Sequence, residues 1–235
     1  MGLFQFRKYE DASVKETILL FHSPRTYREA YRTLSANVEH IAIEEKLKNL
    51  MVTSAIGNEG KSTVAINLSL IFANQGYKTL LINADCHNTK TNNIFNVSTV
   101  QKGFYDILND LSNVGNSIFY DKNTKVHLLH SGLKRLSNIS ITKVKALYDL
   151  LEEKYDFIIT ISPTVNAYAD TAILAQCADG VLLTVKQNGA TSEEVLAAVD
   201  ELDIVGANII GTVFTHRNYL RRKSVLKQYN RLYTK

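Results

Sequence analysis

The chain has 235 residues, of which 45% are hydrophobic, and this length suits one α/β domain with a large core and no second domain. No apolar run approaches the length of a membrane span, and two cysteines are too few for a disulfide framework, which fits a reducing cytoplasm. The net charge of +4 is uneven. Residues 216–235 contain seven Lys and Arg and no acid, and the other 20 Lys and Arg against 23 Asp and Glu give −3.

Helices and short apolar strands are expected to alternate along the chain. Helical spacing of apolar residues predicts helices at residues 24–46, directly after 54–63, at 141–154 and at 193–205. Apolar runs of strand length occur at residues 50–53, 78–85, 126–130, 157–161, 180–185 and 209–214. The polar stretch between residues 88 and 124 has only a weak helical signal, near residues 104–111. This alternation predicts an α/β fold with a doubly wound, mainly parallel sheet, helices on both faces, and a ligand beyond the carboxyl ends of the strands.

The loop at residues 54–63, SAIGNEGKST, indicates a phosphate-binding site of the P-loop NTPase type, because it follows a strand and precedes a helix. Glycines let the backbone curl so that successive N–H groups face phosphate oxygens. The lysine can reach the β- and γ-phosphates, and the following serine offers a hydroxyl to Mg²⁺. The residues expected to bind the nucleotide are Gly57, Asn58, Glu59, Gly60, Lys61, Ser62 and Thr63. Ala55 replaces the first glycine of the strict pattern, and the alternative is a glycine-rich turn that happens to end in Lys-Ser.

The order of motifs resembles the bacterial tyrosine kinases of capsule and exopolysaccharide synthesis, which belong to the MinD/ParA-type group of P-loop ATPases. Residues 24–37 are similar to that family's oligomerisation helix, with its E-x-x-R-x-x-R pattern. Residues 78–85, KTLLINAD, resemble its second nucleotide motif, which ends D-x-D, and residues 155–164 resemble its Walker B strand. Residues 170–185 are similar to the segment that comes after the Walker B strand in that family.

The resemblance implies ATP-dependent tyrosine kinase activity, with ATP and Mg²⁺ as cofactors. Lys61 and Asp85 would be catalytic, and Ser62 and Asp85 would hold the metal. The tail tyrosines expected to be autophosphorylated are Tyr219, Tyr229 and Tyr233.

The implied partners are further copies of the chain and a membrane-anchored, Wzz-like polysaccharide co-polymerase that activates the kinase. Self-association would use Glu29 and Arg32, although Ser35 replaces the last arginine of the pattern. The implied location is the cytoplasm, at the inner face of the membrane through that partner.

Departures from the family pattern fall on the chemistry. Asn83 stands in place of the first Asp of D-x-D, and Ile161 in place of the Walker B Asp. Mg²⁺ prefers carboxylate and water oxygens, so an amide is a weaker ligand and an aliphatic side chain is none. Attenuated catalysis is therefore expected, unless Asp170, beyond the carboxyl edge of the sheet, supplies a carboxylate. Asp156 begins its strand at the wrong end of the sheet to do so.

The chain divides into a kinase-like nucleotide-binding domain at residues 1–215 and a basic, tyrosine-bearing tail at 216–235. Apolar residues of the tail recur at helical spacing, which suits an anionic membrane surface or an acidic partner. The alternative is a solvated tail, and nucleic-acid binding is not expected. For function, a working kinase, a pseudokinase serving as a structural or regulatory ring subunit, and a MinD/ParA-type ATPase all remain open.

Overall fold

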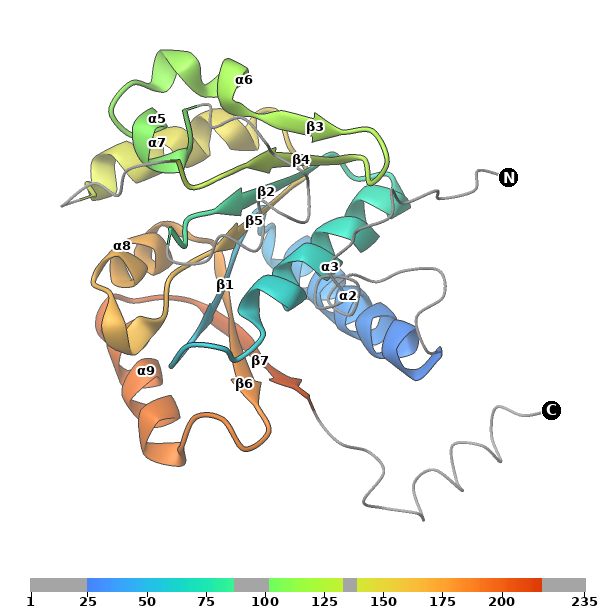
Figure 1. The fold of residues 1–235 in the computed structure, drawn as a ribbon, viewed down its shortest axis with the longest axis vertical. Helices are drawn as coiled ribbons and strands as arrows, with labels where there is room; N and C mark the ends of the chain where they lie inside the picture. Colours follow the sequence, from blue (N-terminus) through green and yellow to red (C-terminus); the bar gives the residue numbers. More distant parts are fainter. Residues whose placement is uncertain (1–24, 87–101, 133–138, 217–235) are drawn as a thin grey trace, which may run out of the picture.

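The computed structural model describes residues 25–86, 102–132 and 139–216, which form a central sheet with helices on both faces (Figure 1). The sheet has seven strands in the order β3-β4-β2-β5-β1-β6-β7, and every pair except β3–β4 is parallel. The strands are β1 (Asn49–Ser54), β2 (Thr79–Asn83), β3 (Phe119–Asp121), β4 (Val126–Leu129), β5 (Phe157–Ile161), β6 (Gly180–Lys186) and β7 (Ile209–Thr215). The predicted fold class and all six predicted strands are confirmed.

The helices form two layers, one on each side of the sheet (Figure 1). The helices are α2 (Arg25–Glu45), α3 (Lys61–Gln75), α5 (Phe104–Ile107), α6 (Val114–Ser117), α7 (Ile141–Glu152), α8 (Asp170–Cys177) and α9 (Ser192–Ile204), with 3₁₀ turns η1 (Leu111–Asn113) and η2 (Val165–Ala167). Helices α2 and α3 cover one face, whereas α7, α8 and α9 cover the other. Within the described ranges, no helix combines the length and the apolar character needed to cross a membrane.

Strand β2 illustrates why these segments appear in the sequence as continuous apolar runs. Its side chains alternate between the faces of the sheet: Leu81 packs in the core under α2 and α3, while Leu80 and Ile82 pack in the core under α7 and α8. All three side chains are fully buried. A parallel sheet covered on both faces needs apolar residues at nearly every position, so the period-two pattern disappears.

Strand β3 and helix α8 were not predicted from the sequence. Strand β3 is a short, half-exposed edge strand that pairs antiparallel with β4. Its turn is closed by Asp121, which accepts hydrogen bonds from the Thr124 hydroxyl at 2.8 Å and, through its carbonyl, from the Lys125 N–H at 2.7 Å. Helix α8 spans only eight residues, and most of its own residues are apolar or small, so its sequence shows no helical periodicity.

Carboxylates hold the amino edge of the sheet together. Asp179, just before β6, accepts hydrogen bonds from the backbone N–H groups of Lys48 and Asn49, each at 2.8 Å. Asp156, just before β5, accepts one from the N–H of Lys78 at 2.7 Å. Each acid thus joins the start of one strand to the start of a neighbour. We call Asp156 and Asp179 the amino-edge acids.

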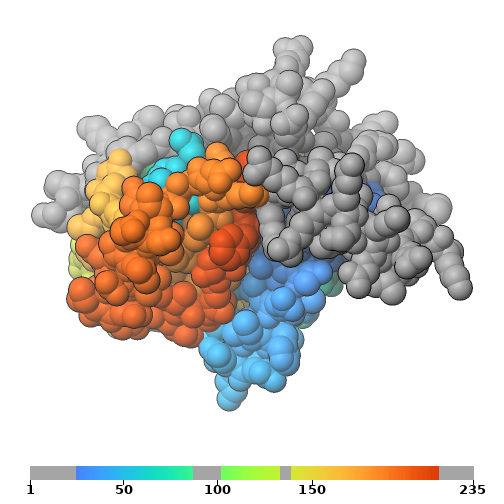
Figure 2. Space-filling view, turned by 90° about the horizontal axis from the view of Figure 1, so that it is seen from below, coloured from blue at the N-terminus to red at the C-terminus, as the bar shows by residue number. Residues whose placement is uncertain are grey.

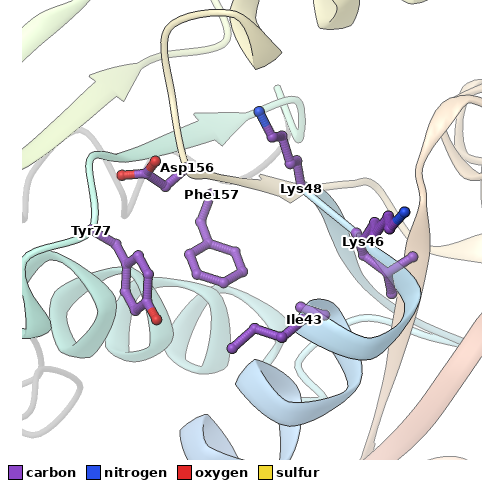
Figure 3. Close-up of a pocket in the computed structure, with 8 residues that line it drawn as sticks. Ile43, Lys46, Lys48, Tyr77, Asp156 and Phe157 are labelled. Atoms are coloured by element: carbon purple, nitrogen blue, oxygen red, sulfur yellow. The ribbon is translucent and has the colours of Figure 1, made fainter.

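A shallow hollow opens at this same edge (Figure 3). It is lined by the end of α2 and the starts of β2 and β5, and Tyr77 and Phe157 form its apolar wall. Asp156 lies on the rim of this hollow, directly before β5. Its carboxylate is therefore at the opposite end of the strands from the loop at residues 54–63, as the sequence predicted. The carboxyl end of α2 also contacts the start of β7, where the Asn208 amide donates a hydrogen bond to the Glu45 carboxylate at 3.2 Å. Figure 2 shows α2 in blue against the orange and red surface of α9 and β7.

Candidate functional site: the phosphate loop

The loop between β1 and α3 turns through two left-handed residues, Asn58 (φ 63°) and Gly60 (φ 88°). Gly60 is also the N-cap of α3, and as a glycine it has no side chain to cap the first turn of the helix. Its backbone conformation is one that glycine adopts without strain, so the predicted curl is confirmed at this position. Gly57, the other glycine expected to shape the loop, does not have a positive φ, and a Cβ there would meet no atom of the described residues within 4 Å. The tight turn therefore depends on Asn58 and Gly60.

The structure brings together the two residues predicted to be catalytic. Lys61, the first residue of α3, places its ammonium 2.9 Å from a carboxylate oxygen of Asp85, which follows β2. The two side chains are only 8% and 5% exposed, so each charge has a close partner that offsets much of its desolvation. Ser62 and Thr63 lie on the same first turn of α3.

Asn83 and Ile161 lie side by side at the carboxyl edge. They are register partners in the parallel pair of β2 and β5, so their side chains share one face of the sheet. That face carries α3, because Ile161 belongs to the core that contains Val64 and Leu68. Both side chains are fully buried. The pairing of β2 with β5 thus puts a neutral amide and an aliphatic side chain at two neighbouring positions beneath the start of α3.

The amide oxygen of Asn83 is already engaged. It accepts a hydrogen bond from the backbone N–H of Asp85 at 3.1 Å, which closes a turn after β2 and fixes where Asp85 emerges. The backbone N–H of Ala84 is held by the carbonyl of Ile161 at 2.9 Å. The chain from Asn83 to Asp85 is thus built into the edge of the sheet, and it aims the Asp85 carboxylate at Lys61.

Glu59 fastens the phosphate loop to the carboxyl end of the neighbouring strand β6 and to the loop that follows it. Its carboxylate is 1% exposed and accepts hydrogen bonds from the backbone N–H groups of Lys186 at 2.5 Å and Ala190 at 3.3 Å. Its carbonyl accepts one from the Thr215 hydroxyl at 2.8 Å. A side chain at Gly189 would overlap the carboxylate. We call these contacts the Glu59 clamp. The carboxylate points away from the loop interior, so the residue's predicted role toward a nucleotide rests on its backbone.

The remaining predicted residues are placed as follows. Asp170 is buried in the first turn of α8, beyond the carboxyl end of β5. Glu29 and Arg32 contact each other within one turn of α2 at 3.4 Å, with side chains 41% and 74% exposed. Ser35 is buried on the stripe of α2 that faces α3, and its hydroxyl donates to the Arg32 carbonyl.

Tyr219, Tyr229 and Tyr233 lie outside the described residues. Across residues 25–86, 102–132 and 139–216, no three His, Cys, Asp or Glu side chains gather closely enough to bind a metal ion.

His130, directly after the carboxyl end of β4, is a buried residue. Its side chain is 3% exposed, and its Nδ1 accepts a hydrogen bond from the N–H of Gly132 at 3.0 Å, which leaves the proton on Nε2. Burial lowers the pKa of His130, while the nearby carboxylate of Asp106 partly offsets this effect. Among the residues that the structure describes, the buried Nε2 of His130 has no hydrogen-bond partner.

Comparisons with known proteins agree with this geometry. A family model described as an AAA domain matches residues 47–205. The tyrosine-protein kinase YwqD of Bacillus subtilis is 28% identical over 211 residues, which cover 88% of this chain and 89% of YwqD. The tyrosine-protein kinase CpsD of Streptococcus pneumoniae is 26% identical over 189 residues, covering 79% of this chain and 82% of CpsD.

Solved structures give the same picture. The VpsO kinase domain superposes with a TM-score of 0.65 at 28% identity, over 82% of this chain and 99% of that domain. The kinase domain of the Escherichia coli tyrosine kinase ETK superposes with a TM-score of 0.70 at 22% identity, over 81% and 77% of the two chains, which shows the shared fold. The resemblance to bacterial tyrosine kinases is thus confirmed, and the chain belongs to the AAA-domain family of P-loop ATPases.

Proposed function

We propose that this chain is a nucleotide-binding subunit of the bacterial tyrosine kinase type, that it regulates capsule or exopolysaccharide synthesis, and that its phosphoryl transfer is weak. The relatives named as tyrosine-protein kinases support the general assignment. The observation that carries the reduced activity is the neutral pair of Asn83 and Ile161 beneath the start of α3.

The donors around the loop fit the phosphates of ATP. The N-cap of α3, the left-handed Gly60, has no side chain to cap the N-terminal turn of the helix. N–H groups and the positive end of the helix dipole bind anions without help from acidic residues. Lys61 is the first residue of this turn, and its ammonium lies at the carboxyl edge of the sheet, where it contacts Asp85. Lys61 would therefore hold the terminal phosphates.

The donors fit Mg²⁺ less well. The residues proposed to hold it are the Ser62 hydroxyl and the Asp85 carboxylate, and the Asp85 carboxylate is paired with Lys61. When bound, the ion supplies charge neutralisation for the transferring phosphoryl group. In this chain Asn83 contributes an oxygen that already accepts the Asp85 N–H, and Ile161 contributes none. Positioning by the loop and the charge of Lys61 are the catalytic contributions that remain.

A pseudokinase is the second candidate, in which nucleotide binding only stabilises a ring subunit. The neutral pair favours it, since nucleotide binding survives the loss of carboxylates more easily than catalysis does. A working kinase with an unusual metal site would need the buried Asp170 to supply the missing charge. In either case the proposed partners are further copies of the chain and a membrane-anchored, Wzz-like co-polymerase, which would bring it to the inner face of the membrane.

Anti-phosphotyrosine blotting of the purified chain with Mg-ATP and its co-polymerase partner tests the proposal. We expect a signal at least about tenfold below that of an intact relative assayed beside it, which corresponds to about 1.4 kcal/mol in the barrier. A triple Tyr219→Phe, Tyr229→Phe, Tyr233→Phe variant controls for the site of modification. A signal equal to that of the relative would overturn the reduced activity and direct attention to Asp170.

A further inference from the structure

We propose that this site binds a nucleotide without a divalent cation, so that its affinity for ATP and ADP is nearly the same with and without Mg²⁺. This inference rests on the nucleotide binding proposed above. It concerns the charge that Asn83, Ile161, Lys61 and Asp85 present to the phosphates.

The four residues named above carry no net charge together before any ligand arrives. Lys61 and Asp85 are in contact at 2.9 Å and nearly buried, so together they contribute no net charge. Asn83 and Ile161 are uncharged at every pH, and both are fully buried on the same face as α3. Glu59 directs its carboxylate to the N–H groups of Lys186 and Ala190, where its charge is partly offset.

Carboxylates beside the phosphates increase the need of a phosphate site for a divalent cation, because like charges repel strongly where water is excluded. Two aspartates at these positions would add two negative charges, and one Mg²⁺ would cancel them. With Asn83 and Ile161, these two negative charges are missing, so the cation has no charge from carboxylates at these two positions to cancel. The phosphates therefore meet about the same net charge here without metal as they would in a two-aspartate site with metal.

The Asp85 carboxylate is also poorly available to a metal. It would have to release the Lys61 ammonium, and the Asp85 backbone is fixed by the hydrogen bond from its N–H to Asn83. An ion that arrives with the nucleotide can remain on the phosphates, with water as its other ligands. The ion then changes the affinity of the site for the nucleotide little in either direction.

Calorimetric titration of the full chain with ADP and with a non-hydrolysable ATP analogue, in EDTA and in millimolar Mg²⁺, measures this directly. We expect dissociation constants within about threefold of each other for the unchanged chain. The variant Asn83→Asp/Ile161→Asp should bind at least about tenfold more weakly in EDTA, and Mg²⁺ should restore its affinity.

The matched control is Asn109→Asp/Ile141→Asp, the same pair of substitutions at exposed positions. It should bind with the same small dependence on Mg²⁺ as the unchanged chain. Circular dichroism establishes that each variant is folded. If the double variant does not fold, Asn83→Asp alone, which keeps the size of the side chain, should show a smaller gain in Mg²⁺ dependence.

The outcomes separate the two proposals. Binding by the unchanged chain that is more than about tenfold tighter with Mg²⁺ would overturn this inference and leave the nucleotide-binding function standing. Absence of binding in both buffers would remove the proposed function, and this inference with it. A folded Asn83→Asp/Ile161→Asp variant whose affinity for the nucleotide is the same in EDTA and in Mg²⁺ would also contradict the charge argument.

Discussion

Replacing Glu59 with alanine should destabilise the whole domain, because the Glu59 clamp joins segments about 130 residues apart in the chain. The substitution leaves the N–H groups of Lys186 and Ala190 without their charged acceptor at a site where the side chain is 1% exposed. Hydrogen bonds to charged groups contribute about 1.5–3 kcal/mol each, and water entering the space recovers part of that. We expect a loss of about 3 kcal/mol in the free energy of unfolding, which lowers Tm by about 6–12 °C in a chain of this size.

Urea unfolding followed by circular dichroism measures the free energy, and a thermal scan measures Tm. Glu59→Gln should lose about half as much, because its amide keeps one acceptor oxygen but turns an NH₂ group toward the second N–H. Glu201→Ala, at an exposed position on α9, is the control and should change stability by less than about 0.5 kcal/mol. A loss below about 1 kcal/mol in Glu59→Ala would refute the reasoning, since it would mean that the buried N–H groups find other acceptors at little cost.

Three further predictions concern the site and its surroundings. Lys61→Met should weaken ADP binding at least about tenfold in calorimetry, and it should also lower Tm, because it removes the cation that contacts the buried carboxylate of Asp85. Gly60→Ala should cost about 1–2 kcal/mol in urea unfolding, because φ is 88° there. Burial lowers the pKa of both His127 and His130 from the ordinary 6.5, so the unfolded chain binds more protons as the pH falls below about 6.5. Stability should therefore be full above that pH and fall toward pH 5 in urea titrations, and His130→Asn, which keeps an acceptor, should flatten the fall.

The strands and the loop were predictable because their signals are local. Each apolar run and the glycine-rich turn is complete within ten residues, and a parallel sheet places the carboxyl ends of its strands at one edge. That rule puts Asn83 and Ile161 at one edge, but their pairing as neighbours depends on the strand order, which the sequence did not predict. The pairing of Lys61 with Asp85 was consistent with it, since both residues come after strands that end at the same edge.

The features that the sequence did not predict depend on contacts between distant segments. Nothing near Glu59 distinguishes a side chain that faces phosphates from one that turns to residues 186–190, because its partners are backbone N–H groups that any sequence supplies. Strand β3 is three residues long and half exposed, so it carries no apolar pattern. The burial of His130 likewise results from the segment at residues 103–108 packing over the end of β4, where the Phe104 N–H bonds the His130 carbonyl at 2.7 Å.

The amino-edge acids bear on how fast a nucleotide arrives. Asp156 is separated from the phosphate loop by the length of β5, five residues, which at about 3.3 Å each is about 16 Å. That is about two Debye lengths at physiological ionic strength, so the repulsion between these acids and an incoming polyphosphate is largely screened. The amino-edge acids are thus too far from the phosphate loop to slow the encounter much. The association rate constant should consequently vary little with salt on their account, and its salt dependence should report the cations near the loop.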